Sequence, residues 1–178
     1  MTRFSSFIAS IQRDGNDGRA FELFVKWFLQ NDPEWSTQVK SVWLWNDWPE
    51  KWGPDTGINL VFEHKNGDIW AVQAKCYDSK YPVSKKDMDT FLSESNRSII
   101  NKRLLVTSTD LMSANAIRTC KHQEKPVVRF MLSDFEIAEV DYRATDFWGE
   151  TGGRGGGWVA AKQCMPWAQD HINANGRR

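Results

Sequence analysis

The segment INLVFEHKNGDIWAVQAK, residues 58–75, constrains the fold most, because it contains two strand-like runs separated by a turn signal. Such a pattern is typical of a β-hairpin with one buried face. Residues 65–67, Lys-Asn-Gly, predict a three-residue loop with glycine in the left-handed conformation, so that residue 64 faces residue 68. This register predicts an apolar face formed by Ile58, Leu60, Phe62, Trp70, Val72 and Ala74.

The same register collects polar side chains on the opposite face of the hairpin. Asn59 faces Gln73 and lies diagonal to Lys75. A two-residue loop would shift the pairing by one position and place Leu60 against Gln73 and Ile58 against Lys75. Because a one-residue slip mixes the two faces in this way, the first register is preferred.

The rest of the chain predicts helices and strands around this hairpin. Asp17 is a candidate N-cap, and Ser84 with Asp87 resembles a capping box, with Val83 and Met88 as a hydrophobic staple. Helices are expected over residues 4–12, 18–30, 85–96 and 113–123, and further strands over 39–45, 103–109 and within 127–140. The order predicts one α/β domain over residues 1–141, with a mixed central sheet flanked by helices. Residues 142–178 are expected to be a Gly-rich linker or tail.

Composition limits the classes of function. The chain carries 23 basic and 23 acidic residues, so any surface for nucleic acid must be local. The cysteines Cys76, Cys120 and Cys164 are odd in number and widely spaced, which indicates neither a zinc site nor a disulfide framework. No apolar run is long enough for a signal peptide or a membrane span. We therefore expect a cytoplasmic location and no membrane partner.

The polar face of the hairpin suits the hydrolysis of a phosphodiester. That reaction needs a divalent cation on the phosphate, a positioned water and positive charge near the developing negative charge. Magnesium prefers hard oxygen ligands. A carboxylate where one strand starts, facing Gln-x-Lys on the next strand, supplies such a site. Here the first position is the amide Asn59.

Three short motifs resemble those of the PD-(D/E)xK nucleases, and specifically the Mrr-like restriction endonuclease domains. They are Gly18-Arg19-Ala20-Phe21-Glu22, Gly57-Ile58-Asn59 and Gln73-Ala74-Lys75. The chain is similar in sequence to the N-terminal nuclease domain of type ISP restriction–modification enzymes in two segments, VWLWNDWPEKWGPDTGINL and WAVQAKCY. The resemblance covers roughly residues 15–140, and the motifs are specific as an ordered set rather than singly.

The resemblance implies a restriction-endonuclease-like fold with an α-β-β-β-α-β core. It implies cleavage of double-stranded DNA with Mg²⁺ or Mn²⁺. It also implies a larger polypeptide in which a helicase-like translocase and a methyltransferase follow the nuclease.

The resemblance also assigns roles to individual residues. Glu22 and position 59 would hold metal, Gln73 would support the site, and Lys75 would act on the attacking water. The metal-binding aspartate of the family falls on Asn59, so we expect cleavage to be strongly impaired. Asp55 is only a minor metal candidate. In an extended chain, four residues separate it from position 59 by about 13 Å, which is too far to replace that residue unless the loop folds back.

Neighbouring residues have two interpretations each. Lys80, Lys85 and Lys86 are candidate phosphate contacts or part of a solvated helix face. The tryptophans before the hairpin either stack on bases or fix the loop to the core, and the burial of aromatic area favours the second. They are Trp43, Trp45, Trp48 and Trp52.

Two further classes of function stay open. One is a nuclease-derived module that binds DNA without cutting it. The other is an interaction domain with a fortuitous polar cluster. In that case Glu22 would pair with Lys26 one helical turn later, and Gln73 and Lys75 would be an ordinary solvated strand face.

Overall fold

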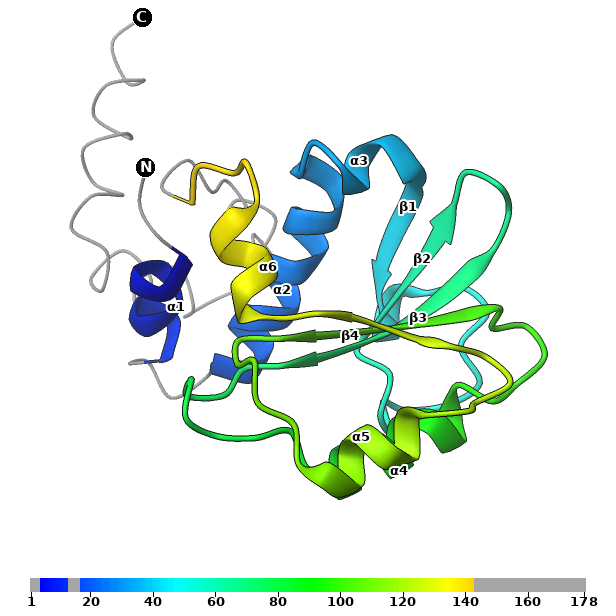
Figure 1. Cartoon of the computed structure of the whole chain (residues 1–178). Coiled ribbons are helices and arrows are strands. Elements are labelled where there is room, and N and C mark those ends of the chain that lie inside the picture. The colour runs from blue at the N-terminus through cyan, green and yellow to red at the C-terminus, as the bar shows by residue number, and fades with distance from the viewer. Residues whose placement is uncertain (1–3, 13–16, 143–178) are drawn as a thin grey trace, which may run out of the picture.

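A computed structural model of the chain describes residues 4–12 and 17–142, so all of the predicted tail, 142–178, except its first residue lies outside them. Figure 1 shows a central sheet with helices on both faces. The elements are α1 (Phe4–Gln12), α2 (Asp17–Asn31), α3 (Trp35–Gln38), β1 (Val39–Leu44), the 3-10 helix η1 (Trp45–Asp47), β2 (Leu60–His64), β3 (Ile69–Lys75), α4 (Lys85–Glu94), β4 (Lys102–Thr107), α5 (Ala114–Cys120), β5 (Val127–Phe130) and α6 (Leu132–Ile137).

The sheet is mixed, as predicted, with strand order β1-β2-β3-β4-β5. The β1, β2 and β3 strands are antiparallel neighbours, whereas β3, β4 and β5 run parallel. The predicted hairpin register is confirmed by the pairs Leu60–Val72 and Phe62–Trp70. Gly67 has a φ of 93°, and its N–H donates to the His64 carbonyl at 2.9 Å, so the three-residue loop is confirmed as well.

The hairpin departs from the prediction at its first residues. Ile58 was expected beside Leu60 on one apolar face, but it packs with Val61 on the opposite face. Regular pairing begins only at Leu60, and the Asn59 N–H donates to the Val72 carbonyl at 2.9 Å, one residue out of the register that follows. The strand alternation therefore does not extend back to residues 58 and 59.

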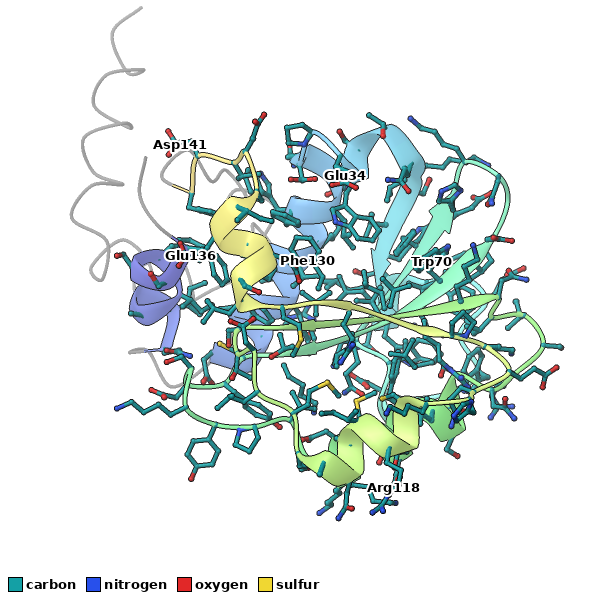
Figure 2. All side chains as sticks on the ribbon, viewed as in Figure 1. Glu34, Trp70, Arg118, Phe130, Glu136 and Asp141 are labelled. Atoms are coloured by element: carbon teal, nitrogen blue, oxygen red, sulfur yellow. The ribbon has the colours of Figure 1, made fainter. Side chains whose placement is uncertain are left out.

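Two apolar layers cover the sheet. Helices α1, α2 and α6 lie on one face, where a phenylalanine-rich cluster forms, and α4 and α5 lie on the other (Figure 1). Phe4 of α1 stacks on Phe135 of α6 with ring centroids 4.2 Å apart. Figure 2 shows Phe130 and Trp70 directed into the α2 side of the sheet, consistent with their place in that cluster.

The C-terminal part of the domain contains a helix that the sequence did not predict. Residues 127–140 were expected to hold a strand, but β5 ends at Phe130 and α6 begins at Leu132. The Asp134 carboxylate accepts a hydrogen bond of 2.7 Å from the Met131 N–H, which turns the chain into the helix. Helix α3 was not predicted either.

The tryptophan interpretation is confirmed for the loop between β1 and β2. Trp45 and Trp48 are buried, and the Trp45 Nε1–H donates to the Gly53 carbonyl at 2.9 Å. Trp52 donates to Glu94 of α4 at 3.1 Å. These contacts fix the loop of residues 46–57 against α4. Among the described residues, no helix is long and apolar enough to cross a membrane.

Candidate active site

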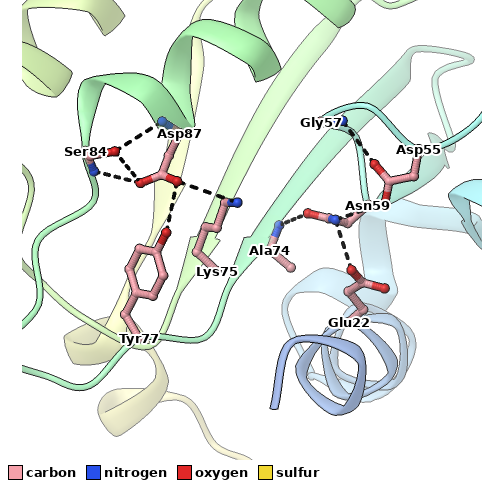
Figure 3. Close-up of polar contacts among 9 residues, drawn as sticks. All are labelled: Glu22, Asp55, Gly57, Asn59, Ala74, Lys75, Tyr77, Ser84 and Asp87. Carbon is pink, nitrogen blue, oxygen red and sulfur yellow. Dashed lines mark hydrogen bonds and ion pairs between the residues drawn. The ribbon is translucent and has the colours of Figure 1, made fainter. Parts of the chain in front are cut away.

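The candidate site lies where β2 begins and β3 ends, between α2 and α4 (Figure 3). Glu22 comes from the second turn of α2, and Asn59 stands immediately before β2. Glu22 lies at the edge of the buried face of α2, one and two turns before the buried Val25 and Leu29, and its carboxylate reaches Asn59. Asn59 is half-buried.

Both the nitrogen and the oxygen of the Asn59 side-chain amide make hydrogen bonds. Its Nδ2 donates to Glu22 Oε1 at 2.9 Å and to Asp55 Oδ2 at 3.3 Å. Its Oδ1 accepts from the backbone N–H of Ala74 at 2.9 Å, so the side chain caps a β3 amide that a regular strand residue would pair through its own carbonyl. The amide thereby joins α2, the loop before β2 and strand β3 at one point.

Asp55 reaches Asn59 because the loop folds back. An extended chain would separate residues 55 and 59 by about 13 Å. Instead, Gly57 adopts a φ of 137°, and its N–H donates to Asp55 Oδ1 at 3.0 Å. The separation expected for an extended chain is therefore wrong for this loop. Asp55 and Glu22 both accept a hydrogen bond from the Asn59 side-chain nitrogen.

The Glu22 carboxylate is affected by both burial and charge. Burial is the largest influence and raises its pKa, and the negative charge of Asp55 acts in the same direction. Arg19, which pairs with Glu22 Oε2 at 3.2 Å, and the Asn59 hydrogen bond oppose this rise without cancelling it. A bound cation would favour the ionised carboxylate.

Gln73 is directed to the other side of the sheet. Its side chain is only 3% exposed. In the amide orientation that satisfies its hydrogen bonds, the nitrogen donates to the carbonyls of Gly57 at 3.1 Å and Asp87 at 3.3 Å. Gln73 therefore joins the loop before β2 to helix α4.

Lys75 also contacts α4. Its Nζ lies 3.7 Å from Asp87 Oδ1, and the same oxygen accepts a 2.9 Å hydrogen bond from the Tyr77 hydroxyl (Figure 3). The other carboxylate oxygen of Asp87 accepts from the Ser84 N–H and hydroxyl at 2.9 and 2.7 Å. This confirms the predicted capping box of α4.

The structure thus divides the predicted site into two adjoining polar groups. Asn59 joins Glu22 and Asp55 on the α2 side, whereas Gln73 and Lys75 join Asp87 on the α4 side. The sequence placed Asn59, Gln73 and Lys75 on one side, and this differs because the strand alternation fails before Leu60. Two links still join the groups, through the Ala74 N–H and the Gly57 carbonyl.

The oxygen donors match Mg²⁺ in type. No set of three or more His, Cys, Asp and Glu side chains suited to a metal ion occurs in residues 4–12 and 17–142. Glu22 and Asp55 nevertheless both accept a hydrogen bond from the Asn59 side-chain nitrogen. A cation bound between the two carboxylates would take the place of that nitrogen. The chain provides two carboxylates and an amide there, one carboxylate fewer than with aspartate at position 59.

The candidate DNA contacts lie next to this site in the chain. Lys80 is exposed in the loop after β3, and Lys85 and Lys86 are exposed in the first turn of α4. Lys85 pairs with Asp89 one turn later. None of these three lysines is part of the two polar groups described above.

Asp87 and Tyr77 were not predicted as site residues. The sequence assigned Asp87 to the helix cap alone. The signal that could have identified them is position, because Tyr77 continues the alternation of Gln73 and Lys75, and the capping box brings the first turn of α4 to that end of β3.

This mixed sheet, its β2–β3 hairpin and its flanking helices have the arrangement of a restriction-endonuclease-like domain. Residues 30–151 match the model of a family described as a restriction endonuclease, Mrr_cat_2. The chain belongs to this restriction endonuclease family. The match begins after Glu22, which precedes it in α2.

Solved structures agree with the family. The chain is 31% identical to the ATP-dependent type ISP restriction-modification enzyme LlaBIII, solved bound to DNA, with a TM-score of 0.67 over 79% of this chain and 9% of that chain. The DNA modification-dependent restriction endonuclease AspBHI has the same fold, at 17% identity and a TM-score of 0.53 over 96% of this chain and 39% of that chain. A comparison with curated protein sequences gives no match. The chain therefore corresponds to a small part of LlaBIII.

Proposed function

We propose that this chain is the Mg²⁺-dependent DNA endonuclease domain of a restriction system, and that Asn59 weakens its cleavage. One observation carries the proposal: in a member of a restriction endonuclease family, the side chain of position 59 contacts Glu22 and lies beside the strand that ends in Gln73-Ala74-Lys75. Double-stranded DNA is the proposed substrate, and translocase and methyltransferase domains of a larger polypeptide are the proposed partners.

The proposed roles follow from the positions of the side chains. Glu22, Asp55 and the Asn59 oxygen would hold Mg²⁺ or Mn²⁺, which would polarise the scissile phosphate. For this the Asn59 amide must turn over, and the Ala74 N–H then loses its acceptor. Lys75 would place positive charge near the developing negative charge and orient the attacking water. Gln73 would hold the loop before β2 in place against α4.

The central test is Asn59→Asp, which restores a carboxylate of the same shape. We expect Mg²⁺-dependent nicking or linearisation of supercoiled plasmid that the unaltered chain lacks or shows at least tenfold more weakly. Asn46→Asp is the matched control, because it makes the same charge change at an exposed residue outside the site. EDTA should abolish the new activity, and so should Glu22→Gln or Lys75→Ala added to Asn59→Asp.

The outcome separates the proposal from its alternative. If a folded Asn59→Asp protein cuts no faster than the parent, position 59 does not have the proposed role. DNA binding with a steep salt dependence but without cleavage would then favour a catalytically inactive binding module. That alternative is supported by the amide nitrogen, which satisfies both carboxylates without a metal. A chain that does not bind DNA at low salt would be an interaction domain.

A further inference from the structure

The Lys75 ammonium group is paired with a carboxylate from a different element of the fold. Lys75 ends β3, its side chain is 27% exposed, and Asp87 Oδ1 lies 3.7 Å from its Nζ. A lysine at a strand end has many rotamers, and holding it in one of them needs a partner whose own position is fixed.

Asp87 is fixed in this way by the first turn of α4. One carboxylate oxygen accepts both Ser84 donors, so the plane of the carboxylate is set by the capping box. The other oxygen is thereby directed to β3, where it receives the Tyr77 hydroxyl at 2.9 Å and faces Lys75. The two oxygens have separate tasks, one in the helix cap and one at the candidate site.

A second contact ties the same helix residue to β3. The Gln73 amide nitrogen donates to the backbone carbonyl of Asp87 at 3.3 Å. Residues 73 and 75 therefore both engage Asp87, one through its main chain and one through its side chain. Helix α4 is itself fixed, because Met88, Phe91 and Leu92 are buried.

The charge state of Asp87 suits this arrangement. Burial of the carboxylate opposes ionisation and is the largest single influence, but the Ser84 and Tyr77 hydrogen bonds and the charge of Lys75 together lower the pKa of Asp87. The carboxylate is thus an anion at neutral pH and attracts the ammonium group.

We propose that Asp87, supported by Tyr77, is a positioning residue that holds the Lys75 ammonium at the end of β3 for phosphodiester cleavage. The ion pair itself does not depend on the proposed function. Its role in cleavage does, so the two are measured separately.

The first measurement follows the Lys75 ammonium by nitrogen-15 NMR in the unaltered chain, with the signal assigned by its loss in Lys75→Arg. Asp87→Asn should shift the Lys75 signal and increase the mobility of the group. Asp89→Asn is the matched control: it removes the same charge from the same helix, and it should shift the signal of Lys85, its own partner, instead. An unchanged Lys75 signal in Asp87→Asn would overturn the proposal.

The second measurement uses cleavage in the Asn59→Asp background. Asp87→Asn should lower kcat at least tenfold with little change in KM, because Asp87 acts through Lys75 and not on DNA. Asp87→Glu should restore part of the rate. Ser113→Ala, which removes the Ser113 side-chain acceptor for the Ala116 N–H at 3.1 Å in α5, controls for the loss of a helix cap and should leave kcat within twofold.

The outcomes are distinct. If Asp87→Asn cuts at the rate of its parent, or if Ser113→Ala loses as much activity as Asp87→Asn, the positioning role is wrong. If the Asn59→Asp parent itself does not cut, the proposed function fails, together with the catalytic purpose assigned to Asp87. The NMR comparison then still decides whether Asp87 holds Lys75.

Discussion

Gly57 is the residue whose replacement should most directly disturb the loop that carries Asp55. Its φ of 137° lies in a region that L-residues rarely adopt. A Cβ at this position would meet Thr90 Cγ2 at 2.9 Å and the Thr90 carbonyl carbon at 3.2 Å. Gly57→Ala therefore combines backbone strain with a steric clash against α4.

The magnitude can be estimated from these two effects. Backbone strain of this kind costs about 1–3 kcal/mol, and overpacking costs about 1–3 kcal/mol. The reduced freedom of alanine in the unfolded chain returns about 0.4–1 kcal/mol. Because the Thr90 side chain can relieve part of the clash, we expect Gly57→Ala to lower the free energy of unfolding by about 2–4 kcal/mol.

Urea unfolding followed by far-ultraviolet circular dichroism measures this change. Gly18→Ala is the control, because Gly18 lies in α2 with open space around its Cα, and it should be neutral or stabilising by about 0.5–1 kcal/mol. Thr90→Ala added to Gly57→Ala should recover only the side-chain part, since the contact with the Thr90 backbone and the positive φ remain. A loss below about 0.5 kcal/mol for Gly57→Ala would refute the reasoning.

Two further predictions concern α4. Arg103 is 2% exposed and donates to Ser95 Oγ, the Lys125 carbonyl and the Leu92 carbonyl at 2.7, 2.8 and 3.1 Å. Arg103→Met should therefore cost about 2–4 kcal/mol in the same unfolding assay, and an unchanged or raised stability would show that these bonds do not outweigh the burial of the charge. For Asp87, whose pKa is lowered from its ordinary 3.8, the stabilising contribution is complete above that value and is lost as pH falls through the lowered pKa. The difference in stability between the parent and Asp87→Asn should thus be constant near neutral pH and shrink below pH 3.8, and a difference independent of pH there would contradict the assignment.

The sequence correctly predicted those parts of the fold that are determined by residues close together in the chain. Gly67 specifies the hairpin loop and with it the register, because only one loop length keeps the apolar face intact. The Ser84–Asp87 capping box specifies the start of α4. Both signals lie within a few residues of the structure they determine, and they need no tertiary contact to be recognised.

The missed features depend on contacts between distant segments. The change of face at Ile58 follows the positive-φ turn at Gly57, which packs closely against Thr90 of α4. Asp55 reaches Asn59 only because that turn folds the loop back. An extended-chain estimate could not include this, since the loop is fixed by tryptophans that bond to other parts of the chain.

The arrangement of the candidate site was predicted only in part, because Asn59, Gln73 and Lys75 do not share one face of the sheet. Glu22 and Asn59 meet as the motifs imply. Lys75, however, faces a helix residue that the motifs do not contain. Short motifs describe which side chains a reaction needs, whereas the partners that hold those side chains come from whichever element packs nearby.

The folded-back loop also determines how many acidic side chains the candidate site holds. Two positions four residues apart, 55 and 59, bring side-chain atoms within 3.3 Å of each other. With an amide at position 59, the carboxylates of Glu22 and Asp55 still meet at its nitrogen, so two acidic side chains remain at this point. The conformation of one glycine, Gly57, thus decides whether an acidic side chain from the loop reaches this point of the sheet.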